Sequence, residues 1–440
     1  LNYLYQGGMW ETTNMHKYSL MSKIQAQATK TTKIELAVTG RIEQYNYPGV
    51  ASGGAGNIFS QAFRTPPIAP LVYPGGLAGE FEGRTVYGQI YQSGFNKYRN
   101  YVMYNQMVIE QDLPFVRGLK LKGVIAYDLK PIHKKIWKTP MPYYTVDMSS
   151  GSPEYVQAGS DGPEKPTYTQ NYSENQSLTL QGQIQYNNTF GKHEVGGLVV
   201  FEMRNTQGDS FEASRLNYNV NIPELNNGSS DPADIKNSGN SSKTKQRSII
   251  YRVNYAYDGK YLFETSARYD GSYYFAPDHR FGFFPSASIG WRISEENFLK
   301  GRFNWLSNLK LRASYGESGA LAADPFQYLS SYNLYSNSAV LNGKPTQGLS
   351  ELLEPNKYIT WEKARKMDIG FDLGLLNNQI SFSIDYFSEY RSNMLVKPQV
   401  TVPFEYGIGI AQENKGKMKN RGIEFLSLIH ISEPTRQAEI

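Results

Sequence analysis

Polar and apolar residues alternate along much of this chain with a period of two. Residues 177–186 show the alternation most fully, with one set of positions occupied by Leu178, Leu180, Gly182, Ile184 and Tyr186 and the other by Thr179, Gln181, Gln183 and Gln185. Successive side chains of a β-strand point to opposite faces, so this pattern predicts a strand with one apolar and one polar face. The pattern recurs and predicts about thirteen strands, the first near Tyr18. The clearest of the others are residues 33–43, 119–128, 247–257, 261–270, 309–316, 367–374 and 380–387.

The connections between the predicted strands are sorted by length. The short ones are residues 29–32, 112–116, 187–192, 258–260 and 376–379, with the somewhat longer 294–308 on the same side. Between them lie long polar segments rich in Gly, Pro, Asn, Ser and Tyr: residues 45–98, 130–175, 205–246, 271–282, 317–359 and 391–413. Every second connection of a meander falls at the same end of the sheet. Short turns at one end and long loops at the other indicate a transmembrane antiparallel β-barrel.

A soluble all-β architecture, such as a tyrosine-rich propeller or solenoid, would give the same local alternation and stays open at this point. The barrel interpretation carries a further expectation. Unpaired backbone groups at a sheet edge are costly in lipid, and neither end of the predicted strand series closes. We therefore expect residues 1–425 to be part of a larger barrel, with strands missing on one or both sides. The chain opens Leu1-Asn2-Tyr3, without an initiator Met or signal peptide, and contains no apolar run of about 18 residues.

Composition adds constraints on function. The chain has 34 Tyr among 14% aromatic residues, which suits a surface that is half apolar and half wet. It has no Cys, which excludes disulfides, thiolate metal sites and a Cys nucleophile. The net charge of +5 is not gathered into a Lys/Arg block, so no nucleic-acid partner is predicted.

Candidate chemistry is sparse, and no enzyme activity and no cofactor are predicted. No His has a second His at the i+4 spacing of a metal site: the five are His16, His133, His193, His279 and His430. The nearest approach to a catalytic set is Asp270 and Asp278 with His279, which loop solvation explains. No nucleophile elbow, phosphate-binding loop or dinucleotide fingerprint is present.

A set of motifs resembles the SusC/RagA family of TonB-dependent outer-membrane transporters of Bacteroidetes-type bacteria. In order, these are YDGKYL at 257–262, SARYDGS at 266–272, RFGFFPSASIGWR at 280–292, LKLRASYG at 309–316, WEK at 361–363 and NKGKMKNRGIE at 414–424. RTPPI at 64–68 through YPGG at 73–76 also resembles a family loop. Asp258-Gly259 is a two-residue hairpin signal, since both central residues need positive φ. The aromatic residues Trp291, Tyr315, Trp361 and Tyr386 are predicted near strand ends, where aromatic girdles form.

The resemblance implies a barrel of about 22 strands around an N-terminal plug domain. It implies location in the outer membrane, a periplasmic TonB box, energy from the TonB–ExbB–ExbD complex, and a SusD-like surface lipoprotein over the extracellular loops. It implies active import of a large nutrient, either an oligosaccharide or an oligopeptide. A passive porin-like channel and a soluble carbohydrate-binding β protein are the alternatives.

The same comparison divides the chain. We expect the plug and TonB box before Leu1, and the last strands after Phe425, to be missing. Residues 426–436 read LSLIHISEPTR, which corresponds codon by codon to a common transposase sequencing adapter. Residues 426–440 are therefore predicted to be adapter read-through, which sequencing of the native locus across the junction would test.

Two sets of residues are predicted to contact ligand, plug or partner. Aromatic residues in the long loops could stack on sugar rings or on a partner: Tyr273, Tyr274, Tyr328, Tyr332 and Tyr335. Polar residues on the polar strand faces are predicted to face the lumen: Gln181, Gln183, Arg252 and Arg268.

Overall fold

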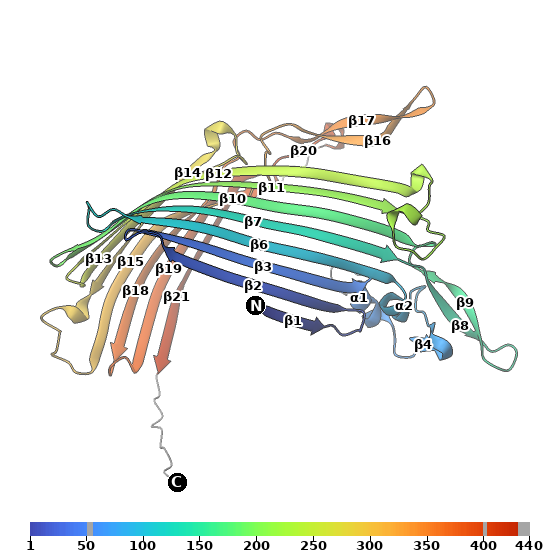
Figure 1. The fold of residues 1–440 in the computed structure, drawn as a ribbon, viewed down its shortest axis with the longest axis horizontal. Coiled ribbons are helices and arrows are strands. Elements are labelled where there is room, and N and C mark those ends of the chain that lie inside the picture. Colours follow the sequence, from blue (N-terminus) through green and yellow to red (C-terminus); the bar gives the residue numbers. More distant parts are fainter. Residues whose placement is uncertain (51–55, 399–402, 430–440) are drawn as a thin grey trace, which may run out of the picture.

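The dominant feature of the computed structural model is one open antiparallel sheet of 14 strands (Figure 1). The structure describes residues 1–50, 56–398 and 403–429. The strands follow one another in chain order, with the smaller elements inserted in the loops, and β1 and β21 form the two edges. Their bounds are β1 (Asn2–Gly7), β2 (Asn14–Gln27), β3 (Thr32–Pro48), β6 (Gly94–Asp112), β7 (Leu119–Lys138), β10 (Thr167–Phe190), β11 (His193–Arg215), β12 (Ile235–Tyr257), β13 (Tyr261–Ser272), β14 (Phe281–Arg292), β15 (Leu306–Ala320), β18 (Glu362–Leu375), β19 (Ile380–Val396) and β21 (Glu413–Ile429).

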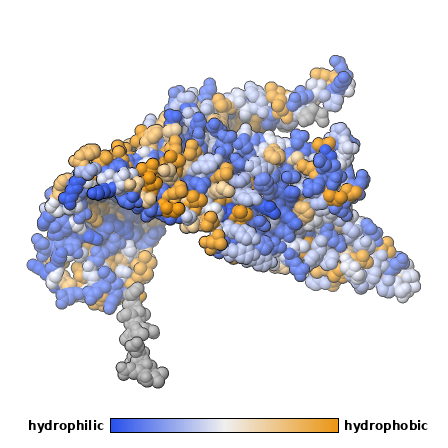
Figure 2. Space-filling view, viewed as in Figure 1, coloured by the Kyte–Doolittle hydropathy of each residue, from blue (hydrophilic) through white to orange (hydrophobic). Residues whose placement is uncertain are grey.

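The two faces of this sheet differ in chemistry. Leu180 of β10 lies opposite Ile125 of β7 and Met203 of β11, and all three apolar side chains are exposed. On the other face, Gln181 lies opposite Glu202. We call these the outer and inner face. Figure 2 shows apolar residues gathered most densely over the short-turn half of the long strands. An exposed apolar face of this extent is what a transmembrane barrel presents to lipid.

The long loops, at the end opposite the short turns, carry all the remaining elements except η5 (Figure 1). They hold two α-helices, α1 (Gly56–Arg64) and α2 (Val86–Tyr91), and short strands β4 (Val72–Tyr73), β5 (Leu77–Ala78), β8 (Met141–Asp147), β9 (Glu154–Asp161), β16 (Ser331–Leu341), β17 (Lys344–Glu354) and β20 (Gly409–Ile410). Single 3₁₀ turns are η1 (Pro74–Gly76), η2 (Leu225–Asn227), η3 (Pro232–Asp234), η4 (Pro277–His279) and η6 (Phe404–Tyr406), and η5 (Ile293–Glu295) lies at the short-turn end. Within the described ranges, no helix is long and apolar enough to cross a bilayer.

The alternation predicts the strands themselves well. The predicted strand near Tyr18 is β2, and the fourteenth strand, beyond the thirteen expected, is β1 at the sheet edge. The hairpin signal at Asp258-Gly259 is confirmed, because both residues have positive φ, 51° and 63°, in the turn between β12 and β13.

The predicted strand ends at the loop end are wrong, because several strands run far into segments predicted to be loops. The first half of β12, residues 235–247, pairs residue by residue with β11, although after Ile235 it contains no apolar side chain. Beyond the apolar belt both faces of a strand meet water, so the alternation disappears while the backbone hydrogen bonds continue. The extension of β10 from Leu178 back to Thr167 is about 35 Å long at the usual rise of a strand.

The alternation also changes phase near the end of β21. Ile423 and Phe425 lie on the outer face, opposite Tyr386 and Ile384. Leu426 and Leu428 then place apolar side chains on the inner face, opposite Ser383 and Ser381. Residues 426–429 are part of β21, and residues 430–440 lie outside the described residues, so adapter read-through stays a prediction.

Arginine placed on the outer face should destabilise the barrel far more than arginine on the inner face. We expect Leu180→Arg to lower the free energy of unfolding by about 2 kcal/mol, since the charge enters the lipid belt. The neighbouring Gln181→Arg is the matched control and should change it by less than about 0.5 kcal/mol, because the new cation meets Glu202 in a wet lumen. Urea unfolding of the complete receptor in vesicles measures both, and equal losses would contradict the assignment of the two faces.

Candidate functional site at the inner face and the loop rim

The inner face carries a ladder of neutral amides on β10. Gln185 donates a hydrogen bond to Gln183 (2.9 Å), Gln183 donates to Gln181 (2.9 Å), and Gln181 donates to Glu202 of β11 (2.5 Å). Residues at alternate positions of one strand share a face, so the ladder follows the strand. The arrangement presents amide donors and acceptors to whatever occupies the lumen.

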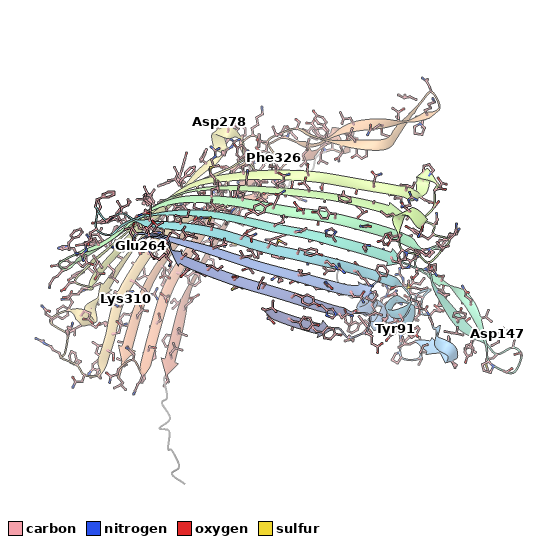
Figure 3. The ribbon with its side chains drawn as sticks, viewed as in Figure 1. Tyr91, Asp147, Glu264, Asp278, Lys310 and Phe326 are labelled. Carbon is pink, nitrogen blue, oxygen red and sulfur yellow. The ribbon has the colours of Figure 1, made fainter. Side chains whose placement is uncertain are left out.

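Ion pairs lie on the same face of the neighbouring strands. The Arg268 guanidinium donates to both oxygens of Asp270, at 3.0 Å each. Arg252 lies 3.7 Å from Glu264, and both side chains are about half exposed. Glu264 and Lys310 are labelled in Figure 3, on the curved part of the wall. The structure therefore places Gln181, Gln183, Arg252 and Arg268 on one face, opposite the apolar one.

A tighter charge cluster lies on β15, β18 and β19. The Arg312 guanidinium reaches three carboxylates: Asp368 (3.2 Å), Asp372 (3.1 Å) and Asp385 (2.6 Å). Gly370 makes room for it, since a Cβ there would lie 2.5 Å from the guanidinium carbon. The cluster has three anions for one cation and leaves negative charge on the inner face.

Sequence reasoning missed this cluster, although its signal was present. All four charged residues occupy polar-phase positions of the predicted strands at 309–316, 367–374 and 380–387. Neighbouring strands of a meander pair in order, so placing these three strands side by side would have brought the charges together.

The long loops are locked to one another by a small apolar core at the loop end. Phe275, Phe284, Ala323, Ile359 and Trp361 are at most 7% exposed and pack together. The Trp361 ring meets Phe275 and Phe284 edge to face, with centroids 5.5 and 5.6 Å away. Trp361 Nε1 donates to the carbonyl of Arg280 (3.0 Å). The prediction that Trp361 belongs to an aromatic girdle is therefore wrong: the ring precedes β18 and turns into the loop core.

Two further clusters fix the other loops. In the first, Trp137, Tyr168 and Tyr218 are buried together, and the Tyr218 hydroxyl donates to the carbonyl of Glu224 (3.0 Å). In the second, Ile58 of α1 packs on Val86 and Ile90 of α2. We call the loops held by these three apolar clusters the loop rim.

Hydrogen bonds tie the rim loops further. Thr85 caps α2 by accepting a hydrogen bond from the Gly88 amide (3.1 Å), and Gln89 donates to Asp161 of β9 (2.9 Å). The Tyr406 hydroxyl donates to Glu354 (2.6 Å), and this hydrogen bond raises the pKa of Tyr406. The rim is therefore a packed surface, suited to recognition by shape.

The predicted loop tyrosines fall into two groups. Tyr274 packs on the apolar core around Trp361, and its carbonyl accepts from the amide of Phe326, two residues before Tyr328. Asp278 and Phe326, labelled in Figure 3, mark this region at the loop end. Tyr273 lies under the Arg280 guanidinium, 4.4 Å from ring centroid to carbon.

The other group lies on the β16–β17 hairpin. Tyr332 and Tyr335 are 57% and 49% exposed there. Hydrogen bonds with the side chains of Ser350 and Asn333 lower the pKa of Tyr335. The structure thus packs Tyr274 on the rim core, Tyr273 against Arg280 and Tyr328 against the Phe326 ring (centroids 6.4 Å apart). Tyr332 and Tyr335 lie on an exposed hairpin, and contact of either group with a ligand stays a prediction.

The possible catalytic set does not assemble. Asp270 is paired with Arg268 on the wall, whereas Asp278 and His279 belong to η4 in the loop. Among residues 1–50, 56–398 and 403–429, no three His, Asp or Glu side chains gather in a way that could hold a metal ion. His430 lies outside the described residues.

An open sheet with a lipid-suited outer face, a polar inner face and loops at one end defines the wall of a transmembrane β-barrel. Residues 91–429 match the family described as TonB dependent receptor-like, beta-barrel. The chain belongs to this family of outer-membrane proteins, and a receptor named SusC is among its relatives.

Several known proteins are similar to the chain. It is 26% identical over 432 residues to TonB-dependent receptor P3 of Formosa agariphila. The aligned region covers 96% of the chain and 41% of the relative. It is 34% identical over 180 residues to TonB-dependent receptor SusC of Bacteroides thetaiotaomicron, 40% of the chain and 18% of the relative. The solved structure of the RagAB peptide transporter superposes with a TM-score of 0.78 at 19% identity, over 98% of the chain and 46% of that structure. The chain thus spans less than half the length of these relatives.

Proposed function

We propose that the complete receptor imports an oligosaccharide or oligopeptide through this barrel, driven by TonB–ExbB–ExbD acting on a plug domain. The support is the combination of a polar wall with a packed rim at one end. The amide ladder and the paired charges offer hydrogen bonds to a polar solute or plug. RagAB, whose structure is similar to this chain, is a peptide transporter.

We further propose that a SusD-like surface lipoprotein covers the loop rim. A rim held by three apolar clusters presents a preformed surface, and preformed surfaces lose little entropy on association. The β16–β17 hairpin projects beyond the sheet in Figure 1 and carries the exposed Tyr332 and Tyr335. Exposed tyrosines are common anchors in such interfaces.

Uptake assays in the native bacterium test the import proposal. Cells lacking the receptor gene, cells lacking TonB and complemented cells receive fluorescent oligosaccharide and oligopeptide mixtures. We expect one mixture to accumulate only in cells with both the receptor and TonB. Uptake that persists without TonB would support a passive channel and contradict the proposal.

The partner proposal has its own test. Full-length receptor is purified with and without the lipoprotein encoded beside it, and the complex is weighed by native mass spectrometry. We expect a stable complex that is lost in Tyr332→Ala/Tyr335→Ala and kept in Tyr143→Ala/Tyr144→Ala, a matched change on the β8–β9 hairpin. A complex unaffected by the first pair would remove the hairpin from the interface.

A further inference from the structure

Cations collect on the outer face directly beyond the apolar belt at the loop end. On β6 the outward residues run Ile109, Met107, Asn105, Met103 and Tyr101, followed by Arg99 and Lys97. From Ile109 to Tyr101 the strand rises about 27 Å, or about 21 Å along the barrel axis at a usual tilt. Arg99 and Lys97 therefore lie just beyond the boundary of the hydrocarbon layer.

Other strands also carry cations on the outer face beyond the apolar belt at the loop end. The outer face at the short-turn end carries none of these cations. Above the belt, outward positions hold Lys135 on β7, Lys243, Lys245 and Arg247 on β12, Lys363 and Arg365 on β18, and Lys419 and Arg421 on β21. The acids in this zone are Glu174, Asp209 and Glu317, the last paired with Arg365. The outermost positions at the short turns are instead apolar, aromatic or neutral, as with Tyr257, Tyr261 and Trp291. The cationic excess faces one leaflet.

The densest part of this zone spans β2, β3, β6 and β7. Two adjacent rungs of the register hold Asn14–Asn46–Lys97–Lys135 and His16–Gln44–Arg99–His133. They line a hollow of about 720 Å³. Every outward side chain of these two rungs can donate a hydrogen bond, and none is a carboxylate.

The three permanent cations of these rungs have no anionic partner within the described chain. Lys97, Arg99 and Lys135 are exposed and form no ion pair with a described residue, although Lys97 lies 4.7 Å from the Phe95 ring centroid. Glu174, one rung closer to the belt, accepts a hydrogen bond from the Tyr172 hydroxyl. Lys97 and Lys135 are directly opposed, an arrangement that destabilises a sheet unless an anion lies between them.

Aromatic rings border the hollow, with Tyr101 on the belt side and Tyr172 on β10 directly opposite His133. Tyr101 and Tyr172 both pack edge to face on His133, with centroids 6.0 and 4.8 Å away. Aromatic rings of this kind lie at the level of lipid headgroups. The hollow is therefore at headgroup height, facing the leaflet on the loop side.

From this geometry we propose that Lys97, Arg99 and Lys135 bind a phosphate group on the headgroup of an outer-leaflet glycolipid. Arg99 supplies the planar donor pair that suits phosphate, and the two lysines supply point charges on either side of the β6–β7 pair. The neutral amides of the rungs provide hydrogen bonds for the sugar that carries the phosphate.

Lipid binding by the complete receptor in a non-ionic detergent tests this site. Native mass spectrometry and a titration measure affinity for bisphosphorylated lipid A and for the same lipid A after dephosphorylation. We expect the wild-type receptor to prefer the phosphorylated form at least tenfold. Lys97→Gln/Arg99→Gln/Lys135→Gln should lose about 100-fold in affinity for it.

The control removes three cations from the inner face near the short-turn ends of β3 and β7, as Lys33→Gln/Lys120→Gln/Lys122→Gln, and should bind like the wild type. Heat-dependent migration on gels verifies that each variant forms a barrel. If the outer-face triple variant does not fold, Arg99→Gln alone, with an expected loss of about tenfold, carries the test.

Three results would overturn the proposal. They are equal binding of the two lipid A forms, equal losses in the outer- and inner-face variants, and displacement of lipid A by an excess of inorganic phosphate. The last would identify an adventitious ion only.

Discussion

Replacing Trp361 by alanine is expected to release the loop rim while the barrel wall stays folded. Trp361 is 7% exposed, contacts Phe275 and Phe284 and donates a hydrogen bond to the Arg280 carbonyl. Loss of a buried Trp costs about 4 kcal/mol. The cost falls on loop contacts, because Trp361 precedes β18 and is not part of the lipid-facing surface. The equilibrium constant for local opening of the rim should therefore rise roughly 1000-fold.

Hydrogen exchange of the complete receptor measures this effect. Amides of the loop between β13 and β14 should exchange far faster in Trp361→Ala, and those of β10 and β11 should be unchanged. Tyr358→Ala, a nearby aromatic that is 79% exposed, is the control. Equal exchange in Trp361→Ala and the wild type would show that the apolar cluster does not hold the loops.

Replacing Arg312 by alanine is expected to lower the free energy of unfolding of the whole barrel by about 3 kcal/mol. The change leaves Asp368, Asp372 and Asp385 close together without their cation. Removing one partner of a mostly buried charge cluster costs several kcal/mol, and partial exposure places this case at the low end. Arg252→Ala is the control, since its 3.7 Å pair with Glu264 is half exposed and should contribute less than about 1 kcal/mol.

Denaturant unfolding in vesicles measures both changes. A second substitution gives a sharper result: Asp385→Asn in the Arg312→Ala background should recover part of the lost stability, because it removes one of the repelling charges. A double variant less stable than Arg312→Ala would contradict the electrostatic explanation.

The sequence predicts the wall of this molecule much better than its rim. Where a strand crosses lipid, each side chain must suit either hydrocarbon or water, so the phase of Leu180 and Gln181 can be read from neighbouring residues alone. The position of Trp361 cannot, since its burial depends on Phe275 and Phe284, which are distant in sequence. Its place next to a strand suggested the lipid boundary, and packing between loops decided otherwise.

The Arg312 cluster could be predicted from the sequence in part. Each of its residues is on the face that the alternation predicts, but their convergence on one guanidinium depends on the register of three strands. Alternation fixes the face of a residue and leaves its height open, because a shift of two residues keeps every side chain on the same side.

The extensions of β10, β11 and β12 beyond the belt have a consequence for how such a receptor can change. These ribbons are held by backbone hydrogen bonds, and water bathes both of their surfaces. Away from the packed end around Tyr168, substitutions there meet neither hydrocarbon nor a packed interior, so such changes should do little harm to folding. The region gives the molecule a tolerant scaffold on which recognition can diversify while the part embedded in the bilayer stays the same.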